Sequence, residues 1–118
     1  MISQQDISEY IGQEMPELSD ICSREKSRTV YDVVRHMLKY TKTQMIRHNL
    51  IAAQKCMALA EQLYYKGNNA VKNAIENVFV YSFSHAFFHD ADQMKEVLDI
   101  VPPSLYRLYR AQVVNSHL

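Results

Sequence analysis

The chain has 118 residues and a mass of 13.8 kDa, a length that suits one domain built around one core. Its 47% hydrophobic and 22% charged residues exclude an intrinsically disordered chain, and its scarcity of turn residues, two Gly and three Pro, argues against a strand-rich fold. The formal net charge is zero, which argues against the strongly basic class of nucleic-acid-binding proteins.

The first helices are predicted from capping residues and apolar spacing. Ser3 and Asp6 resemble a capping pair, and the residues after them predict a helix that ends near Met15. Pro16 suits the first turn of a short second helix, which the polar stretch SREKSR ends. From Thr29 onwards, apolar side chains recur at steps of three and four, the period of an amphipathic helix: Val30, Val33, Val34, Met37, Leu38, Thr41 and Met45.

A helical hairpin is predicted in the middle of the chain. The segment from Leu50 to Lys66 has an apolar sector wider than one stripe, so we expect a central helix there. Gly67 stands where a helix would end in a left-handed cap, and Asn68 or Asn69 can cap the following helix. The stretch YKGNN therefore predicts two antiparallel helices joined by a tight turn, the second of which continues to about Phe88.

Two more helices are predicted in the last third of the chain. Asp90 with Gln93 resembles a capping box for a helix that must stop before Pro102, and Ser104 is predicted to cap the last helix. The predicted fold is therefore all-α, in one domain over residues 1–118. We expect an irregular bundle of five to six helices around a central antiparallel helical hairpin, or a helical-repeat-like array.

The charges are unevenly distributed along the chain. Residues 1–25 hold six acidic residues and one basic residue, a net charge of −5, whereas residues 26–55 hold seven basic residues and one acidic residue, a net charge of +6. Two interpretations follow. The two segments lie side by side and neutralise each other, or the helix over residues 35–47 presents a basic binding face.

The best candidate metal site is a pair of histidines at a spacing of four. His85 and His89 would share one face of a helix, with Asp90 directly after them, and two imidazoles and a carboxylate are possible zinc ligands. The pair His89 and Asp90 is similar to one found in all-helical metal-dependent phosphohydrolases of the HD type. The competing interpretation is that Asp90 caps a helix and that the histidines are polar members of an aromatic segment. Under that interpretation we expect no metal and no cofactor.

Candidate partner-binding residues fall in two basic and aromatic clusters. Cations beside tyrosines suit phosphate contacts and base stacking, and Tyr and Arg are also enriched at protein-binding hot spots. The competing interpretation is a solvated basic face and a helix rim packed by tyrosines. The candidates are Arg35, Lys39, Lys42, Tyr106, Arg107 and Arg110.

The stretch AEQLYYKGNNAVKNAIENVFV, followed by VPPSLYRLYRAQ, resembles a family of small bacterial all-helical proteins, a domain of unknown function. The resemblance covers about residues 29 to 115. Its motifs are a turn and two helix caps, so it implies a fold and no catalytic residues. Domains of this general kind are sometimes similar to bacterial immunity proteins, and the hairpin is similar to a single tetratricopeptide repeat without a second copy.

These observations predict a non-enzymatic protein-protein interaction module, immunity-like or an adaptor, in the bacterial cytoplasm. The alternatives are a small metal-dependent hydrolase that uses His85, His89 and Asp90, and a weak nucleic-acid binder. The N-terminal stretch lacks the features of a signal peptide, and no apolar run approaches the roughly 20 residues of a membrane span. A homodimer is a further expectation, because residues 78–88 carry more apolar surface than one helix usually buries.

Overall fold

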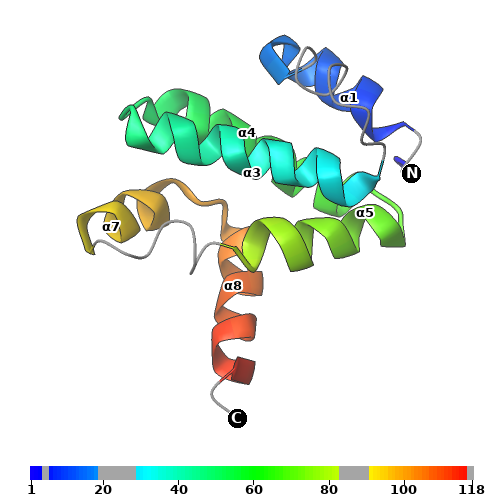
Figure 1. Cartoon of the computed structure of the whole chain (residues 1–118). Helices are drawn as coiled ribbons and strands as arrows, with labels where there is room; N and C mark the ends of the chain where they lie inside the picture. The colour runs from blue at the N-terminus through cyan, green and yellow to red at the C-terminus, as the bar shows by residue number, and fades with distance from the viewer. Residues whose placement is uncertain (4–5, 19–28, 83–90, 117–118) are drawn as a thin grey trace.

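The computed structural model describes residues 1–3, 6–18, 29–82 and 91–116. Within these ranges the chain is almost entirely helical and forms no β-strand, so the predicted all-α fold is confirmed (Figure 1). The elements are α1 (Ile7–Glu14), α3 (Val30–Ile46), α4 (Leu50–Lys66), α5 (Asn69–Ala74), the π-helical segment η1 (Ile75–Val80), α7 (Ala91–Ile100) and α8 (Pro103–Ser116).

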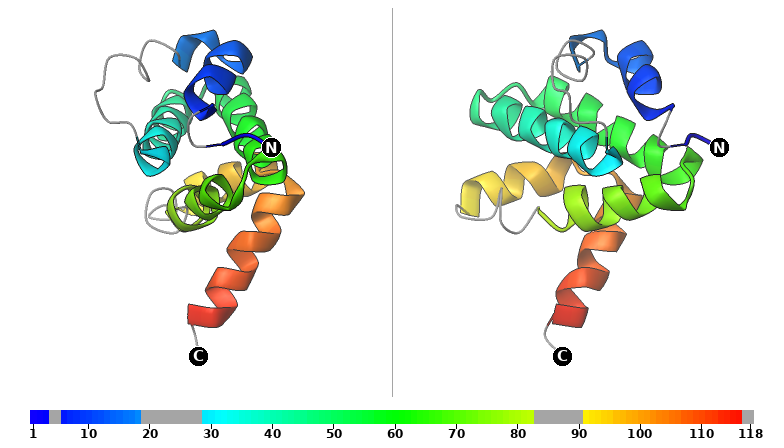
Figure 2. Two further views of the ribbon diagram at one scale, coloured as in Figure 1. Left: turned by 90° about the vertical axis from the view of Figure 1, so that its right-hand side faces the viewer. Right: turned by 45° about the vertical axis from the view of Figure 1, so that its right-hand side comes forward.

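The helices α3, α4 and the continuous helix α5–η1 form the centre of the fold. Seen end-on in Figure 2, they make a triangle, with α1 on one side and with α7 and α8 on the other. The central position predicted for α4 is confirmed, because α4 packs against α3, α5 and η1. Helix α8 packs against η1 and then projects away from the other helices (Figures 1 and 2).

A second antiparallel hairpin, which the sequence did not reveal, joins α3 to α4. The turn between them contains His48 with a positive φ of 58°, the left-handed conformation in which a non-glycine residue is uncommon. The backbone of the turn is held by hydrogen bonds from His48 N to Met45 O at 3.0 Å and from Asn49 N to Gln44 O at 2.8 Å. Asn49 then caps α4, since its side-chain oxygen accepts from Ala52 N at 3.3 Å.

The prediction of a left-handed cap at Gly67 is wrong, because this residue has φ −78° and ψ 159°, an extended conformation. Glycine is needed at this position for a different reason, which is the lack of space for a side chain. A Cβ on Gly67 would lie 2.4 Å from Val71 Cγ1 and 2.5 Å from Leu63 O. The extended backbone also pairs with the N-terminal segment, where Ile2 N donates to Lys66 O at 2.7 Å and Asn68 N donates to Ile2 O at 2.8 Å.

The helix predicted to run to about Phe88 changes character along its length. After Ala74 it widens into the π-helix η1, and a turn follows at Tyr81 and Ser82. Of the segment 78–88, whose apolar surface led us to expect a homodimer, Phe79 and Val80 are fully buried in the core, and residues 83–88 lie outside the described ranges. The buried residues of η1 thus belong to the interior of this chain.

Two predicted helix caps are also corrected. Ser3 Oγ donates to Asp6 Oδ2 at 2.8 Å, but α1 begins only at Ile7, and its N-cap residue is Asp6, which makes no side-chain cap hydrogen bond. Helix α8 begins at Pro103, which suits a first helical position because its missing N–H is no loss there. Ser104 therefore lies inside the first turn of α8, and its hydroxyl makes a short hydrogen bond with the hydroxyl of Tyr65 at the end of α4.

The core includes the thiol of Cys56. Cys56 is fully buried, and its Sγ donates to Met37 O at 3.5 Å, the same carbonyl that accepts the hydroxyl of Thr41 at 2.8 Å. Burial raises the pKa of the Cys56 thiol to about 12, and the Thr41 hydroxyl opposes this change only in part. A protonated, enclosed thiol is a poor nucleophile, so Cys56 is a structural residue.

The raised pKa of Cys56 predicts a loss of stability in alkaline solution. The unfolded thiol ionises near pH 8.5 while the folded thiol stays protonated, so this contribution is present below that pH and is lost as the pH rises toward 12. Between pH 8 and pH 10, the free energy of unfolding should fall by about 2 kcal/mol more with Cys56 than with Cys56→Ala. Urea unfolding of both proteins, in a Cys22→Ser background, measures the difference. Equal slopes with pH would contradict the prediction.

Candidate interaction surface

The three basic candidates on α3 lie in one exposed row. Arg35, Lys39 and Lys42 follow each other at steps of four and three residues, which places them on one face of the helix, and all three are exposed. The opposite face is buried and contains the apolar residues that the sequence predicted. The same step of four leads from Lys42 to Ile46, whose side chain is 60% exposed. We call these four residues the α3 row.

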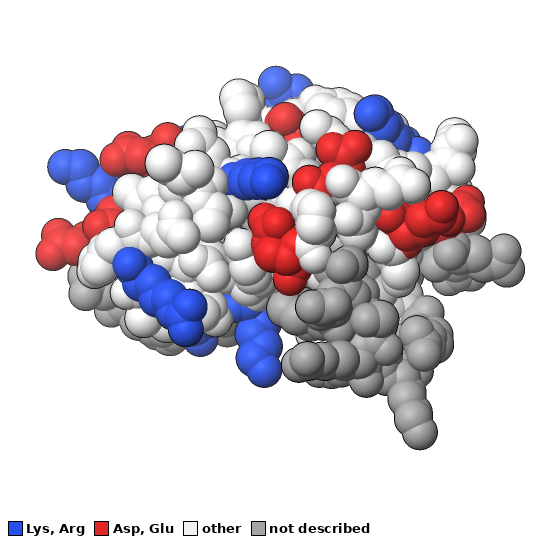
Figure 3. Space-filling model, turned by 90° about the horizontal axis from the view of Figure 1, so that it is seen from above, with Lys and Arg blue, Asp and Glu red and all other residues white. Residues whose placement is uncertain are grey.

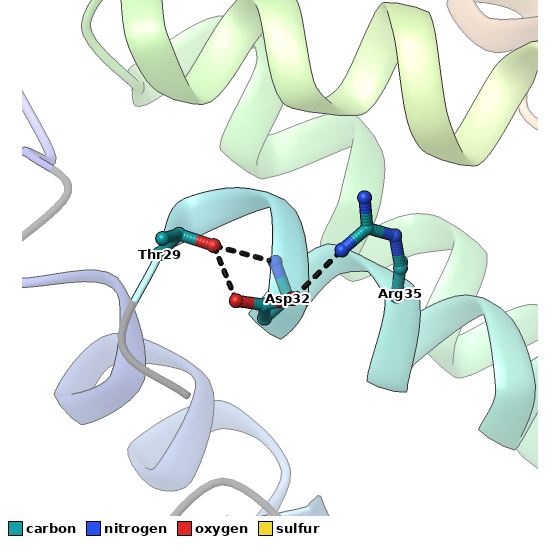
Figure 4. A network of polar contacts seen from close by, with 3 residues as sticks. All are labelled: Thr29, Asp32 and Arg35. Atoms are coloured by element: carbon teal, nitrogen blue, oxygen red, sulfur yellow. Dashed lines mark hydrogen bonds and ion pairs between the residues drawn. The ribbon is translucent and has the colours of Figure 1, made fainter. Parts of the chain in front are cut away.

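Described residues neutralise the positive charge of the α3 row at the Arg35 end and not at the Ile46 end. Arg35 Nη1 lies 2.7 Å from Asp32 Oδ1, and the hydroxyl of Thr29, the N-cap of α3, donates to the other carboxylate oxygen of Asp32 at 2.5 Å (Figure 4). Thr29 Oγ1 also accepts from Asp32 N, so Arg35 belongs to the capping network of its own helix. Lys39 and Lys42 form no ion pair with any described residue, and the positive charge of the row is therefore concentrated next to Ile46.

The turn between α3 and α4 exposes a second aliphatic side chain. Ile51, in the first turn of α4, is 82% exposed, and Ile46 lies in the last turn of α3 on the other side of the same turn. Arg47 and His48 lie between them and are exposed as well, and His48 Nδ1 is 3.9 Å from Glu96 Oε1 of α7. We call Ile46, Arg47 and Ile51 the hairpin tip. It combines exposed apolar surface with positive charge.

Among the residues that the structure describes, the acidic N-terminal segment neutralises only part of the basic segment. Helix α1 packs against α3, and Lys55 Nζ of α4 lies 3.8 Å from Glu17 Oε1. On the face shown in Figure 3, Lys and Arg side chains lie among Asp and Glu side chains and form no single basic block. Mutual neutralisation therefore applies to Lys55, whereas the charges of Lys39 and Lys42 remain uncompensated by described residues.

The second group of candidates lies on α8. Leu105 is buried, and Leu108 and Tyr109 pack against the core, which leaves Arg107 and Arg110 exposed. Arg110 lies over the ring of Tyr106, with Cζ 6.0 Å from the ring centroid. Helix α8 contains no acidic residue. The candidates on α3 and α8 thus occupy different helices, which both pack against η1.

The predicted metal site cannot be placed, because His85, His89 and Asp90 lie outside the described residues. Within the described part of the chain, no three residues of the types His, Cys, Asp and Glu gather closely enough to hold a metal ion. The metal-dependent hydrolase therefore stays a prediction from the sequence.

Sequence reasoning missed the two isoleucines of the hairpin tip. A signal was present, since Ile46 falls outside the buried series that ends at Met45, and Ile51 falls outside the series of Ala53, Cys56 and Leu63 in the next helix. Single exposed apolar residues are common on protein surfaces, so it is the position of both isoleucines beside one turn that makes them a candidate surface.

The described residues thus define an all-helical protein with exposed basic, apolar and aromatic side chains and no described metal-ligand cluster. No described helix combines the length and the apolar character needed to cross a membrane. Residues 8–115 match the family model described as "Domain of unknown function (DUF7674)", so the chain belongs to this family and the suspected membership in a family of unknown function is confirmed. No curated protein and no solved structure matches the chain.

Proposed function

We propose that this protein is a non-enzymatic interaction module of the bacterial cytoplasm, an immunity-like protein or an adaptor, which binds another protein through the hairpin tip. The observation that carries the proposal is the exposure of two aliphatic side chains on either side of one turn, 60% for Ile46 and 82% for Ile51. Exposed aliphatic residues contribute binding free energy when a partner covers them, and Arg47 between them is of a residue type enriched at binding hot spots.

A double variant, Ile46→Lys with Ile51→Glu, tests the proposal without disturbing the fold. Lysine is favourable in the last turn of a helix and glutamate in the first turn, so both substitutions agree with the helix dipoles of α3 and α4. The net charge of the protein does not change. We therefore expect a free energy of unfolding within about 0.5 kcal/mol of the original value.

The expected result is the loss of a partner that the original protein binds. Cross-linked capture from the native host, followed by mass spectrometry, identifies proteins that depend on the tip, and titration of the purified partner gives the dissociation constant. We expect a rise of at least tenfold, because burial of an aliphatic side chain contributes about 1.5–3 kcal/mol and 1.4 kcal/mol corresponds to tenfold.

A matched control is Asn69→Glu with Asn73→Lys, which also keeps the net charge and changes two exposed positions on α5, beyond the opposite end of α4 from the tip. This control should bind like the original protein. If the tip variant retains the partner while Arg107→Glu with Arg110→Glu loses it, the binding surface is α8 and the assignment to the hairpin tip is wrong. The proposal would also be contradicted if all three variants retain the partner.

A further inference from the structure

We infer that the partner contributes an acidic protein segment, which lies along the α3 row with an apolar side chain against Ile46 and carboxylates beside Lys42 and Lys39. The inference rests on the proposed function and specifies the chemistry of the partner. Its basis is the order of side chains on α3, in which two cations without an ion pair to any described residue lead directly to an exposed aliphatic residue.

The geometry of the row sets what the segment must present. From Lys39 to Ile46 the helix rises by about 10 Å at 1.5 Å per residue, with Lys42 between them. A helical segment with carboxylates one turn apart, and an apolar residue one further turn along, matches these three positions. Arg35 adds little to such an interface, because Asp32 already holds its guanidinium at 2.7 Å.

A nucleic acid fits the α3 row less well than an acidic protein segment does. Asp32 is the only acidic residue of α3 and neutralises Arg35, so a phosphate backbone that followed the whole row would meet only the two cations Lys39 and Lys42. Ile46 offers nothing to a phosphate. Base stacking would need exposed aromatic rings beside the lysines, but Tyr40 is partly buried in the core, and Tyr31, which is 38% exposed, lies at the Asp32 end of the row, away from Lys39 and Lys42.

A second copy of this chain also fits poorly when the two rows face each other. In a two-fold contact the same patch is used by both subunits, so Lys39 and Lys42 of one copy would meet the lysines of the other. Like charges placed opposite each other across an interface are unfavourable. An acidic segment instead neutralises both lysines and covers Ile46.

The test uses the full chain and a fluorescein-labelled synthetic peptide of about 15 residues, with glutamates at helical spacing and one leucine. We expect saturable binding that weakens with added salt. Lys39→Gln with Lys42→Gln should raise the dissociation constant about fivefold and flatten the salt dependence, since each exposed ion pair contributes modestly. Ile46→Ser should raise the dissociation constant without changing the salt dependence. The matched control, Lys72→Gln with Lys95→Gln, removes the same charge elsewhere and should leave binding unchanged.

Several outcomes would overturn the inference: no binding at peptide concentrations of about 1 mM, an equal loss in the control variant, or tighter binding of a single-stranded oligonucleotide that depends on Lys39 and Lys42. Equal binding of a peptide with glutamine in place of each glutamate would do the same. The captured partner separates this result from a failure of the proposed function. If Ile46→Lys with Ile51→Glu abolishes its binding but Lys39→Gln with Lys42→Gln does not, the tip binds a partner that is not acidic.

Discussion

Replacement of Phe79 by alanine is expected to lower the free energy of unfolding by about 3–5 kcal/mol. Phe79 is fully buried and is among the largest side chains of the core. It lies in the π-helix η1, which packs against α3, α4 and α8, so the cavity would open where several helices meet. A domain of this size has a total stability of about 5–15 kcal/mol, and the variant should therefore be close to unfolded. Urea unfolding followed by far-UV circular dichroism measures the change.

The control for this variant is Tyr81→Ala, two residues further along the chain. Tyr81 is 57% exposed, so removal of its ring should cost less than about 1 kcal/mol. A Phe79→Ala protein that unfolds at the same urea concentration as Tyr81→Ala would show that η1 does not hold the helices together as described.

Replacement of Gly67 by alanine is the second large effect, and we expect a loss of about 1–3 kcal/mol. The backbone angles of Gly67 are accessible to alanine, so the loss comes from steric overlap. The added Cβ would meet Val71 Cγ1 at 2.4 Å and the backbone oxygen of Leu63 at 2.5 Å, and this oxygen accepts the hydrogen bond of Gly67 N at 2.8 Å. Relief of the overlap requires α4 and α5 to move apart.

Gly12→Ala is the corresponding control. Gly12 lies inside α1, where alanine has the higher helix propensity, so this variant should be neutral or more stable by up to about 1 kcal/mol. Thermal unfolding of both variants distinguishes the two positions. An unchanged melting temperature for Gly67→Ala would contradict the close approach of α4 and α5 at this corner.

The helix boundaries that follow from local chemistry were predicted well. Helix α3 begins directly after Thr29, α4 spans Leu50 to Lys66, and α7 stops before Pro102, because the apolar period and proline act within one or two turns. The predicted caps at Ser3 and Ser104 were wrong. Several nearby residues can begin a helix, so local sequence does not fix its first residue. The hydroxyl of Ser104 points where it does because of its tertiary contact with Tyr65.

The candidate surface was predicted in part. The position of Lys39 and Lys42 on an exposed face follows from the helical period alone. The exposure of Ile46 and Ile51 does not, because an apolar side chain is covered or exposed according to which other helices reach it. The sequence by itself therefore determined the fold class, most of the helices and the charge of the α3 row. Only the tertiary structure decided the extended corner at Gly67, the π-helical turn around Phe79 and the apolar hairpin tip, since each depends on packing between segments distant in sequence.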